Sequence, residues 1–283
     1  NICPGAGSSS PTLLTDVNGM CFFSATDGTN GVELWKSDGT AAGTVLVKDI
    51  YAGAIGTSPS GLVNIGGLCF FAANDGTSGI ELWKSDGTAA GTVLVKDIRS
   101  GVNASSPTNL VNMDGVCFFT ANDGTNGTEL WKSDGTASGT VLVKNIASGG
   151  TSSSPAGLVN VNGLCFFSAT DGVNGRELWK SDGTAAGTVM LKDIAAGAGS
   201  STPTLLTAHG NVFYFSATDP ANGTELWNSD GTTLGTVLAK DINPGLSSSS
   251  PAGLTSCNGF LFFAANDPAA GVEPWTAYQT PDV

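Results

Sequence analysis

The chain has 283 residues, of which only 12% are charged, and its 24 acidic and 11 basic side chains give a net charge of −13. A surface this acidic repels phosphate, so neither nucleic acid nor an anionic membrane surface is an expected partner. No apolar run approaches the roughly 18 residues that a membrane-spanning helix needs, so membrane insertion is not expected either.

The composition and the first residues favour a location outside the cell. The chain begins at Asn1, with no basic and apolar signal segment, as a processed secreted protein does. Gly, Ser and Thr crowd the segments between apolar runs, and Lys is scarce. We therefore expect a secreted or cell-surface protein.

A repeat of 48 residues organises the whole sequence. The string Glu-Leu-Trp recurs at that interval from Glu33 to Glu225, and a sixth copy reads Glu-Pro-Trp at 273–275. Six units fill nearly all of the chain. This pattern predicts a single domain, residues 1–283, built as one array of repeats.

The second repeat shows what each unit contains. Four apolar runs lie at residues 62–65, 68–73, 80–84 and 92–98, separated by turns rich in Gly, Asp and Asn. Short runs of this kind predict four antiparallel strands. The frequent Gly and the lack of a helical period disfavour helices. The turn before the fourth run reads Ser-Asp-Gly-Thr in five of the six repeats, and its Gly supplies the positive φ of a tight hairpin.

The run at 68–73 indicates how the units are arranged. It is apolar at consecutive positions, so neighbouring sheets should cover both of its faces. Four-stranded units of this length, stacked face to face, are typical of a β-propeller. We predict an all-β fold, a six-bladed β-propeller of 48-residue four-stranded repeats. An open β-solenoid is the alternative, but it would need capping repeats that the sequence does not show.

The sixth repeat is predicted to be incomplete. The sequence ends at Val283, before any counterpart of the fourth run, and Asn1-Ile2 match only the end of such a run. We therefore predict that the last blade lacks its outer strand and that the strand around Trp275 presents an open edge. An open edge favours pairing between chains, so we expect self-association into a homo-oligomer or filament.

The repeated unit also resembles a known family. Residues 33–44 read Glu-Leu-Trp-Lys-Ser-Asp-Gly-Thr-Ala-Ala-Gly-Thr, which resembles the bacterial repeat family named for its motif ELWxxDGT. The match is full in repeats one to five. In the sixth repeat Pro274 replaces Leu and the Asp-Gly-Thr is lost. The resemblance implies a bacterial secreted or cell-surface protein and implies no particular activity.

Residues that could support catalysis are scarce. An enzyme needs an asymmetric set of side chains, whereas this chain repeats itself. Its single histidine, His209, takes a position that apolar residues such as Val17 and Ile65 hold in other repeats. The sequence has no zinc-binding spacing and no phosphate-binding Gly loop. We predict a protein that is not an enzyme and has no cofactor.

Acidic residues recur in every repeat and are the candidate metal ligands. In each repeat an Asp is followed six residues later by a Glu, and such oxygens suit calcium. The structural alternative is that the Asp binds backbone N–H groups of its turn and the Glu faces a Lys such as Lys48 across the hairpin. The candidate calcium pairs are Asp27 and Glu33, Asp75 and Glu81, Asp123 and Glu129, Asp171 and Glu177, Asp219 and Glu225, and Asp267 and Glu273.

The six cysteines fall into two groups. Four of them occupy one position of successive repeats, too far apart for a disulfide, and should be buried thiols: Cys21, Cys69, Cys117 and Cys165. Cys3 and Cys257 lie outside this pattern, near the two ends of the array, and are a candidate disulfide.

Two functions without catalysis remain. One Trp per repeat would suit a multivalent carbohydrate-binding lectin, in which six weak sites add up. A Trp beside Leu in a strand covered on both sides is more often core. We therefore predict an extracellular scaffold or adhesion protein, a subunit of a surface assembly, with a lectin for a glycan or other surface ligand as the alternative. The tryptophans concerned are Trp35, Trp83, Trp131, Trp179, Trp227 and Trp275.

Overall fold

The computed structural model describes residues 1–278 and is all-β. These residues contain no helix, and so none long and apolar enough to cross a membrane. Their contacts divide the chain into two compact units, Asn1–Asn145 and Ile146–Val283. The single domain expected from the repeats stays a prediction. Residues 279–283, where the sixth repeat was expected to end, lie outside the described residues.

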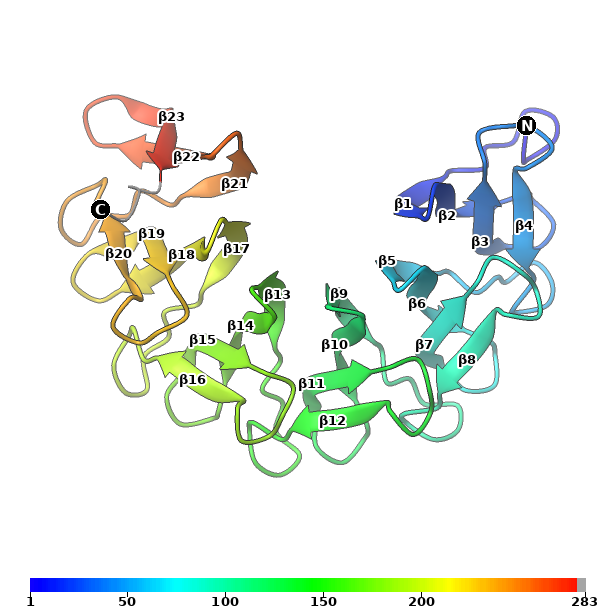
Figure 1. Cartoon of the computed structure of the whole chain (residues 1–283), viewed down its shortest axis with the longest axis horizontal. Coiled ribbons are helices and arrows are strands. Elements are labelled where there is room, and N and C mark those ends of the chain that lie inside the picture. The colour runs from blue at the N-terminus through cyan, green and yellow to red at the C-terminus, as the bar shows by residue number, and fades with distance from the viewer. Residues whose placement is uncertain (279–283) are drawn as a thin grey trace. The chain divides into compact units, whose positions relative to one another are not determined.

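The first unit consists of three antiparallel sheets of four strands, each following chain order (Figure 1). Its strands are β1 (Thr12–Val17), β2 (Met20–Thr26), β3 (Val32–Ser37), β4 (Val45–Lys48), β5 (Ser60–Ile65), β6 (Leu68–Asn74), β7 (Ile80–Ser85), β8 (Val93–Lys96), β9 (Thr108–Met113), β10 (Val116–Asn122), β11 (Thr128–Ser133) and β12 (Val141–Lys144).

The second unit has two sheets of four strands and a last sheet of three, β21-β22-β23. Its strands are β13 (Ala156–Val161), β14 (Leu164–Thr170), β15 (Arg176–Ser181), β16 (Val189–Lys192), β17 (Thr204–His209), β18 (Val212–Asp219), β19 (Gly223–Ser229), β20 (Val237–Lys240), β21 (Ala252–Cys257), β22 (Phe260–Asp267) and β23 (Gly271–Tyr278). The prediction of four-stranded repeats with a three-stranded last repeat is confirmed for the described residues.

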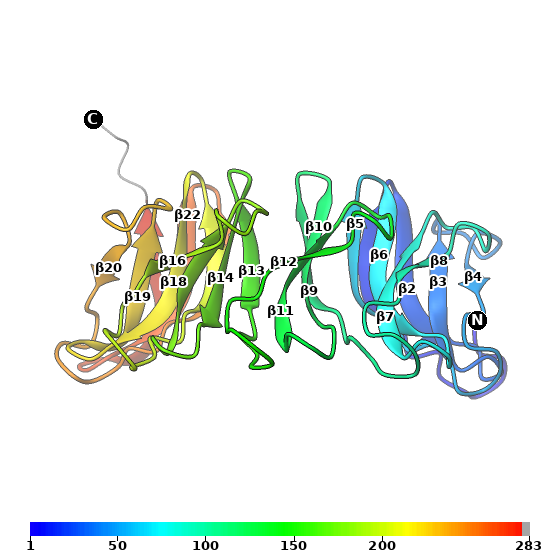
Figure 2. The same cartoon turned by 90° about the horizontal axis from the view of Figure 1, so that it is seen from below.

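Sheets within a unit pack face to face, as the apolar run at 68–73 predicted. Five consecutive residues of β6, from Cys69 to Ala73, are buried. Leu34 of the first sheet and Phe71 and Trp83 of the second belong to one apolar cluster. Figure 2 shows β2, β3, β6 and β7 as neighbouring, roughly upright strands. Each sheet therefore buries both faces of its middle strands against its neighbours.

The glycine of the Ser-Asp-Gly-Thr turn has a second role besides its backbone conformation. Gly87 has a φ of +87°, and a Cβ there would lie 3.1 Å from the ring atom Cζ of Phe22 in the preceding sheet. Gly135 meets Phe70 at the same distance. The turn must accept positive φ and also leave room for an aromatic ring, and only glycine does both.

The four repeated cysteines differ in burial. Cys69, Cys117 and Cys165 are fully buried, as predicted, whereas Cys21 in the first sheet is only partly buried. The structure holds all six cysteines as free thiols, so it does not contain the disulfide predicted between Cys3, which is buried, and Cys257, which is exposed.

This burial predicts a clear order of thiol reactivity. Burial raises the pKa of the Cys69 thiol to about 12 and also raises the pKa of Cys117 and Cys165. The thiolate is the reactive form, so in the native protein iodoacetamide should modify Cys257 first and the three buried cysteines only after unfolding. Peptide mass mapping with and without denaturant measures this order. Rapid modification of Cys117 in the native protein would contradict the packing described above.

Candidate functional site: the junctions between sheets

The glutamates of the repeated Glu-Leu-Trp fasten one sheet to the loop that leads into the next. The carboxylate of Glu81 on β7 is fully buried. It accepts hydrogen bonds from the backbone N–H groups of Ile98 at 3.0 Å and Ser105 at 2.8 Å, and from the Ser105 hydroxyl at 2.5 Å. The N–H of Arg99 lies at 3.4 Å. All of these donors belong to the loop between β8 and β9.

The same junction recurs in both units. Glu33 accepts from the N–H and hydroxyl of Thr57 at 2.8 and 2.7 Å. Glu177 binds Ser201 and Glu225 binds Ser249 in the same way. Each acceptor and donor are 24 residues apart. The repeat period therefore carries one buried carboxylate and one hydroxyl partner from sheet to sheet.

Burial and hydrogen bonding act in opposite directions on these carboxylates. Loss of solvent raises the pKa of Glu33 and of Glu81, while hydrogen bonds from Thr57 and Ser105 partly offset the effect. The net direction is upward for both groups. A buried carboxylate that accepts several N–H and O–H groups is satisfied as an acceptor but still costs free energy to desolvate.

The expected pairing of the glutamate with a lysine across the hairpin is wrong. The Nζ of Lys48 instead donates to the backbone carbonyl of Thr92 in the next sheet, at 2.9 Å. The Nζ of Lys96 donates to Thr140 at 2.8 Å. The acceptor in each case is the residue just before the fourth strand of the next sheet, so these lysines also join sheets.

The candidate calcium pairs are not assembled into metal sites. Asp27 accepts hydrogen bonds from the N–H groups of Asn30 and Thr29, which lower its pKa. Asp75 receives the N–H groups of Thr77 and Ser78 in the same manner. Each Asp thus orders its own hairpin turn, whereas the described Glu partners lie in the junctions. Within residues 1–278, no three His, Cys, Asp or Glu side chains gather as metal ligands. Calcium binding stays a prediction.

The aromatic and histidine candidates are mostly enclosed. Five of the tryptophans, from Trp35 to Trp227, expose only 5–8% of their surface, which leaves no ring face for a sugar. Trp275 is partly buried. His209 is 4% exposed, and its Nδ1 lies 2.9 Å from the hydroxyl of Ser256 on β21. It is a strand residue that helps to join two sheets, as its position in the repeat predicted.

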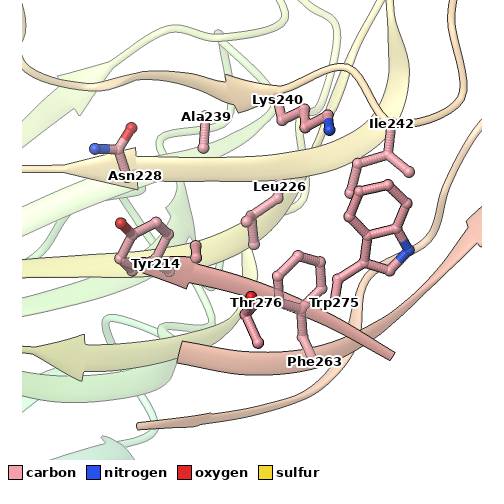
Figure 3. Close-up of a pocket in the computed structure, with 10 residues that line it drawn as sticks. Tyr214, Leu226, Asn228, Ala239, Lys240, Ile242, Phe263, Trp275 and Thr276 are labelled. Atoms are coloured by element: carbon pink, nitrogen blue, oxygen red, sulfur yellow. The ribbon is translucent and has the colours of Figure 1, made fainter. Parts of the chain in front are cut away.

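The last sheet departs from the pattern. Glu273 is exposed, unlike the fully buried Glu33 and Glu81. Phe262 is 45% exposed, whereas Phe70 at the same place in the second repeat is 2% exposed. The three-stranded sheet also borders a pocket of about 320 Å³, lined in part by Leu226, Lys240, Ile242, Phe263 and Trp275 (Figure 3).

Sequence reasoning missed the hydroxyl partners of the glutamates. A Ser or Thr occurs 24 residues after every Glu of the first five repeats, so the signal was present in the sequence. It was hidden because the partners lie in Ser-rich loops where hydroxyl residues are common. The residues concerned are Thr57, Ser105, Ser153, Ser201 and Ser249.

Removal of a junction carboxylate should destabilise the protein strongly. Glu81→Ala leaves buried N–H and O–H donors without an acceptor, which should cost roughly 3 kcal/mol of unfolding free energy. Glu273→Ala is the matched control, since its side chain is exposed in the structure and its loss should change stability by less than about 0.5 kcal/mol. Urea denaturation measures both. An equal loss in the two variants would show that Glu273 also has a partner in solution.

The raised pKa of Glu81 sets the sign of a pH effect. A carboxyl whose pKa is raised by folding stabilises the fold fully below its ordinary value of 4.5, and this contribution is lost as the pH rises through the folded pKa. Glu81→Gln does not titrate. Its stability relative to the native protein should therefore improve as the pH rises from about 4 to about 7. A stability difference that stays constant across denaturation curves at these pH values would contradict the raised pKa.

Comparison with known proteins bears on the fold. No family model and no curated protein matches the sequence, so the resemblance to the ELWxxDGT family stays a prediction. Solved structures do match. The chain is similar to the β-propeller domain of the trilobed protease from Pyrococcus furiosus, with a TM-score of 0.55 and 7% identity over 98% of this chain and 83% of that one.

Two peptidases give similar matches. Prolyl oligopeptidase B from Galerina marginata matches with a TM-score of 0.61 and 12% identity, over 96% of this chain and 42% of the enzyme. A puromycin hydrolase matches with a TM-score of 0.53 and 13% identity, over 96% of this chain and 52% of the enzyme. The chain thus spans about two fifths to half of these enzymes. At such low identity the likeness shows the fold alone, a β-propeller of repeated antiparallel sheets.

Proposed function

We propose that the protein is a non-catalytic extracellular scaffold or adhesion protein, a subunit of a surface assembly. One observation carries the proposal. The polar side chains that recur in every repeat are used to join sheets or to order turns, as with Glu81 and Asp75, and none converges on a reaction site in the described residues. What the molecule offers to a partner is its surface and the incomplete last sheet.

The proposal includes a six-bladed propeller in which each sheet is one blade. The 48-residue period and the six successive sheets support the count of six. The likeness to propeller domains supports the architecture, and the solenoid alternative has no such support. A secreted or cell-surface location rests on the composition and on the resemblance to the ELWxxDGT family.

The similarity to peptidases does not make this chain a peptidase. The match covers about half or less of those enzymes and involves 12–13% identity. The single histidine of this chain is held by Ser256 between two strands. The likeness is therefore one of scaffold, and a binding role fits a rigid propeller.

Self-association should strengthen with salt. The net charge of −13 repels like molecules at low ionic strength, and salt screens that repulsion. We expect the weight-average mass in light scattering to rise with protein concentration, and to rise further between about 20 and about 500 mM NaCl. Calcium and chelator should leave the mass unchanged.

Three outcomes separate the candidate functions. A monomer at every concentration and salt level would contradict the assembly. Specific signals on a glycan array would favour the lectin instead, with Trp275 as the most accessible ring. A mass increase that requires calcium would revive the acidic pairs as metal ligands.

A further inference from the structure

The last sheet has an unpaired edge where every other sheet has a fourth strand. Within residues 1–278, β23 pairs only with β22. In the second sheet the corresponding edge of β7 holds β8, with Trp83 opposite Leu94 and Lys84 opposite Val93. The other four-stranded sheets repeat this register, as with Trp227 opposite Leu238. The same register on β23 would place a leucine opposite Trp275.

The pocket beside β23 has the shape of a site for that leucine. In the first unit, Leu94 packs against a cluster that includes Leu34, Phe71 and Trp83, with Ile50 beside it. One repeat period relates these walls to others in the last two sheets. Their counterparts, at the same positions of the repeats, are Leu226, Phe263, Trp275 and Ile242.

All four counterparts line the pocket of about 320 Å³ between the last two sheets. Figure 3 shows Phe263 and Trp275 on the last sheet facing Leu226 and Ile242 of the preceding one. Trp275 is only partly buried, while Trp83, covered by Leu94 and its neighbours, is 6% exposed. The pocket is therefore the same apolar socket without its leucine.

Lys240 is the polar part of the same site. The equivalent lysines Lys48, Lys96 and Lys192 each donate to a threonine carbonyl at the start of the next fourth strand. Lys240 has no such carbonyl among the described residues, and its Nζ lies 4.6 Å from the ring centre of Trp275. A strand added to β23 would bring that carbonyl to the lysine.

We infer that the edge of β23 and the adjoining pocket form a binding site for an extended segment of a partner chain with the pattern Thr-Val-Leu-Val-Lys. The segment pairs with β23 by backbone hydrogen bonds, its leucine fills the pocket, and its threonine carbonyl accepts from Lys240. This is strand addition, in which the backbone supplies affinity and the pocket supplies specificity. The inference goes beyond the proposed scaffold and does not require it, since any partner with such a segment would fit.

The test uses the full chain and a labelled peptide, Thr-Val-Leu-Val-Lys-Asp-Ile, copied from residues 92–98. We expect saturable binding in fluorescence anisotropy and slower hydrogen exchange in β23. A peptide with Asp in place of the central Leu is the matched control and should bind at least tenfold more weakly, because a charge cannot enter the apolar pocket.

Two variants localise the site. Lys240→Ala should weaken peptide binding severalfold. Lys192→Ala, whose lysine lies in a complete junction, should lower stability but leave the affinity unchanged. If chains already occupy the edge of one another, the peptide should also reduce the mass measured by light scattering in the same titration.

Three results would overturn the inference. The first is no saturable binding together with no change in mass. The second is equal binding of the leucine and aspartate peptides. The third is exchange protection in a complete sheet, such as at β7, in place of β23. Failure here leaves the proposed scaffold standing if the protein still self-associates, because the association would then use another surface.

Discussion

The structure depends on a buried carboxylate that accepts hydrogen bonds from a loop 24 residues further along the chain. A β-sheet with two apolar faces has no means of its own to set the position of the next sheet, since apolar contacts are not directional. The hydrogen bonds at Glu81 are directional, and an unmet donor in that buried place is costly. The loop of Ile98, Arg99 and Ser105 is therefore held in one path, and the following sheet begins where that path ends. The repetition of this interaction explains why the Glu of Glu-Leu-Trp recurs while its neighbours in the loops vary.

A second set of contacts acts at the other end of each fourth strand. Lys48 and Lys96 reach the carbonyl before the next fourth strand, so adjacent outer strands are linked by side chain to backbone bonds. Charge is used sparingly in both cases. The carboxylate is enclosed and the lysine is half-buried, so the acidic surface comes mainly from aspartates such as Asp27 and Asp86, which order turns. The same division explains how a strongly acidic chain can still pack sheet on sheet.

The 48-residue period and the apolar runs were enough to predict the sheets, because strand periodicity and turn residues are local signals. In the second repeat the runs at 68–73 and 80–84 became β6 and β7 almost unchanged. The run at 92–98 was too long: β8 ends at Lys96, and Ile98 turns away to donate its N–H to Glu81. That donor and acceptor lie 17 residues apart, and no local pattern announces such a pair. For the same reason the glutamates were first considered as calcium ligands or lysine partners, and the pocket beside Trp275 was predicted only as an open edge.

The last sheet shows how a repeat can lose a strand and remain ordered. Ala277 stands where Ser85 binds the hydroxyl of Thr92, so the last sheet lacks the hydroxyl pair that closes the turn before the other fourth strands. Its remaining hairpin is longer. β22 and β23 are joined by eight residue pairs, against six between β6 and β7. The added pairs hold β23 in place without an outer neighbour, because a longer antiparallel ladder shares the cost of turn closure over more hydrogen bonds. An edge that is ordered but unpaired, beside a socket with its apolar walls in place, has already met part of the entropic cost of binding.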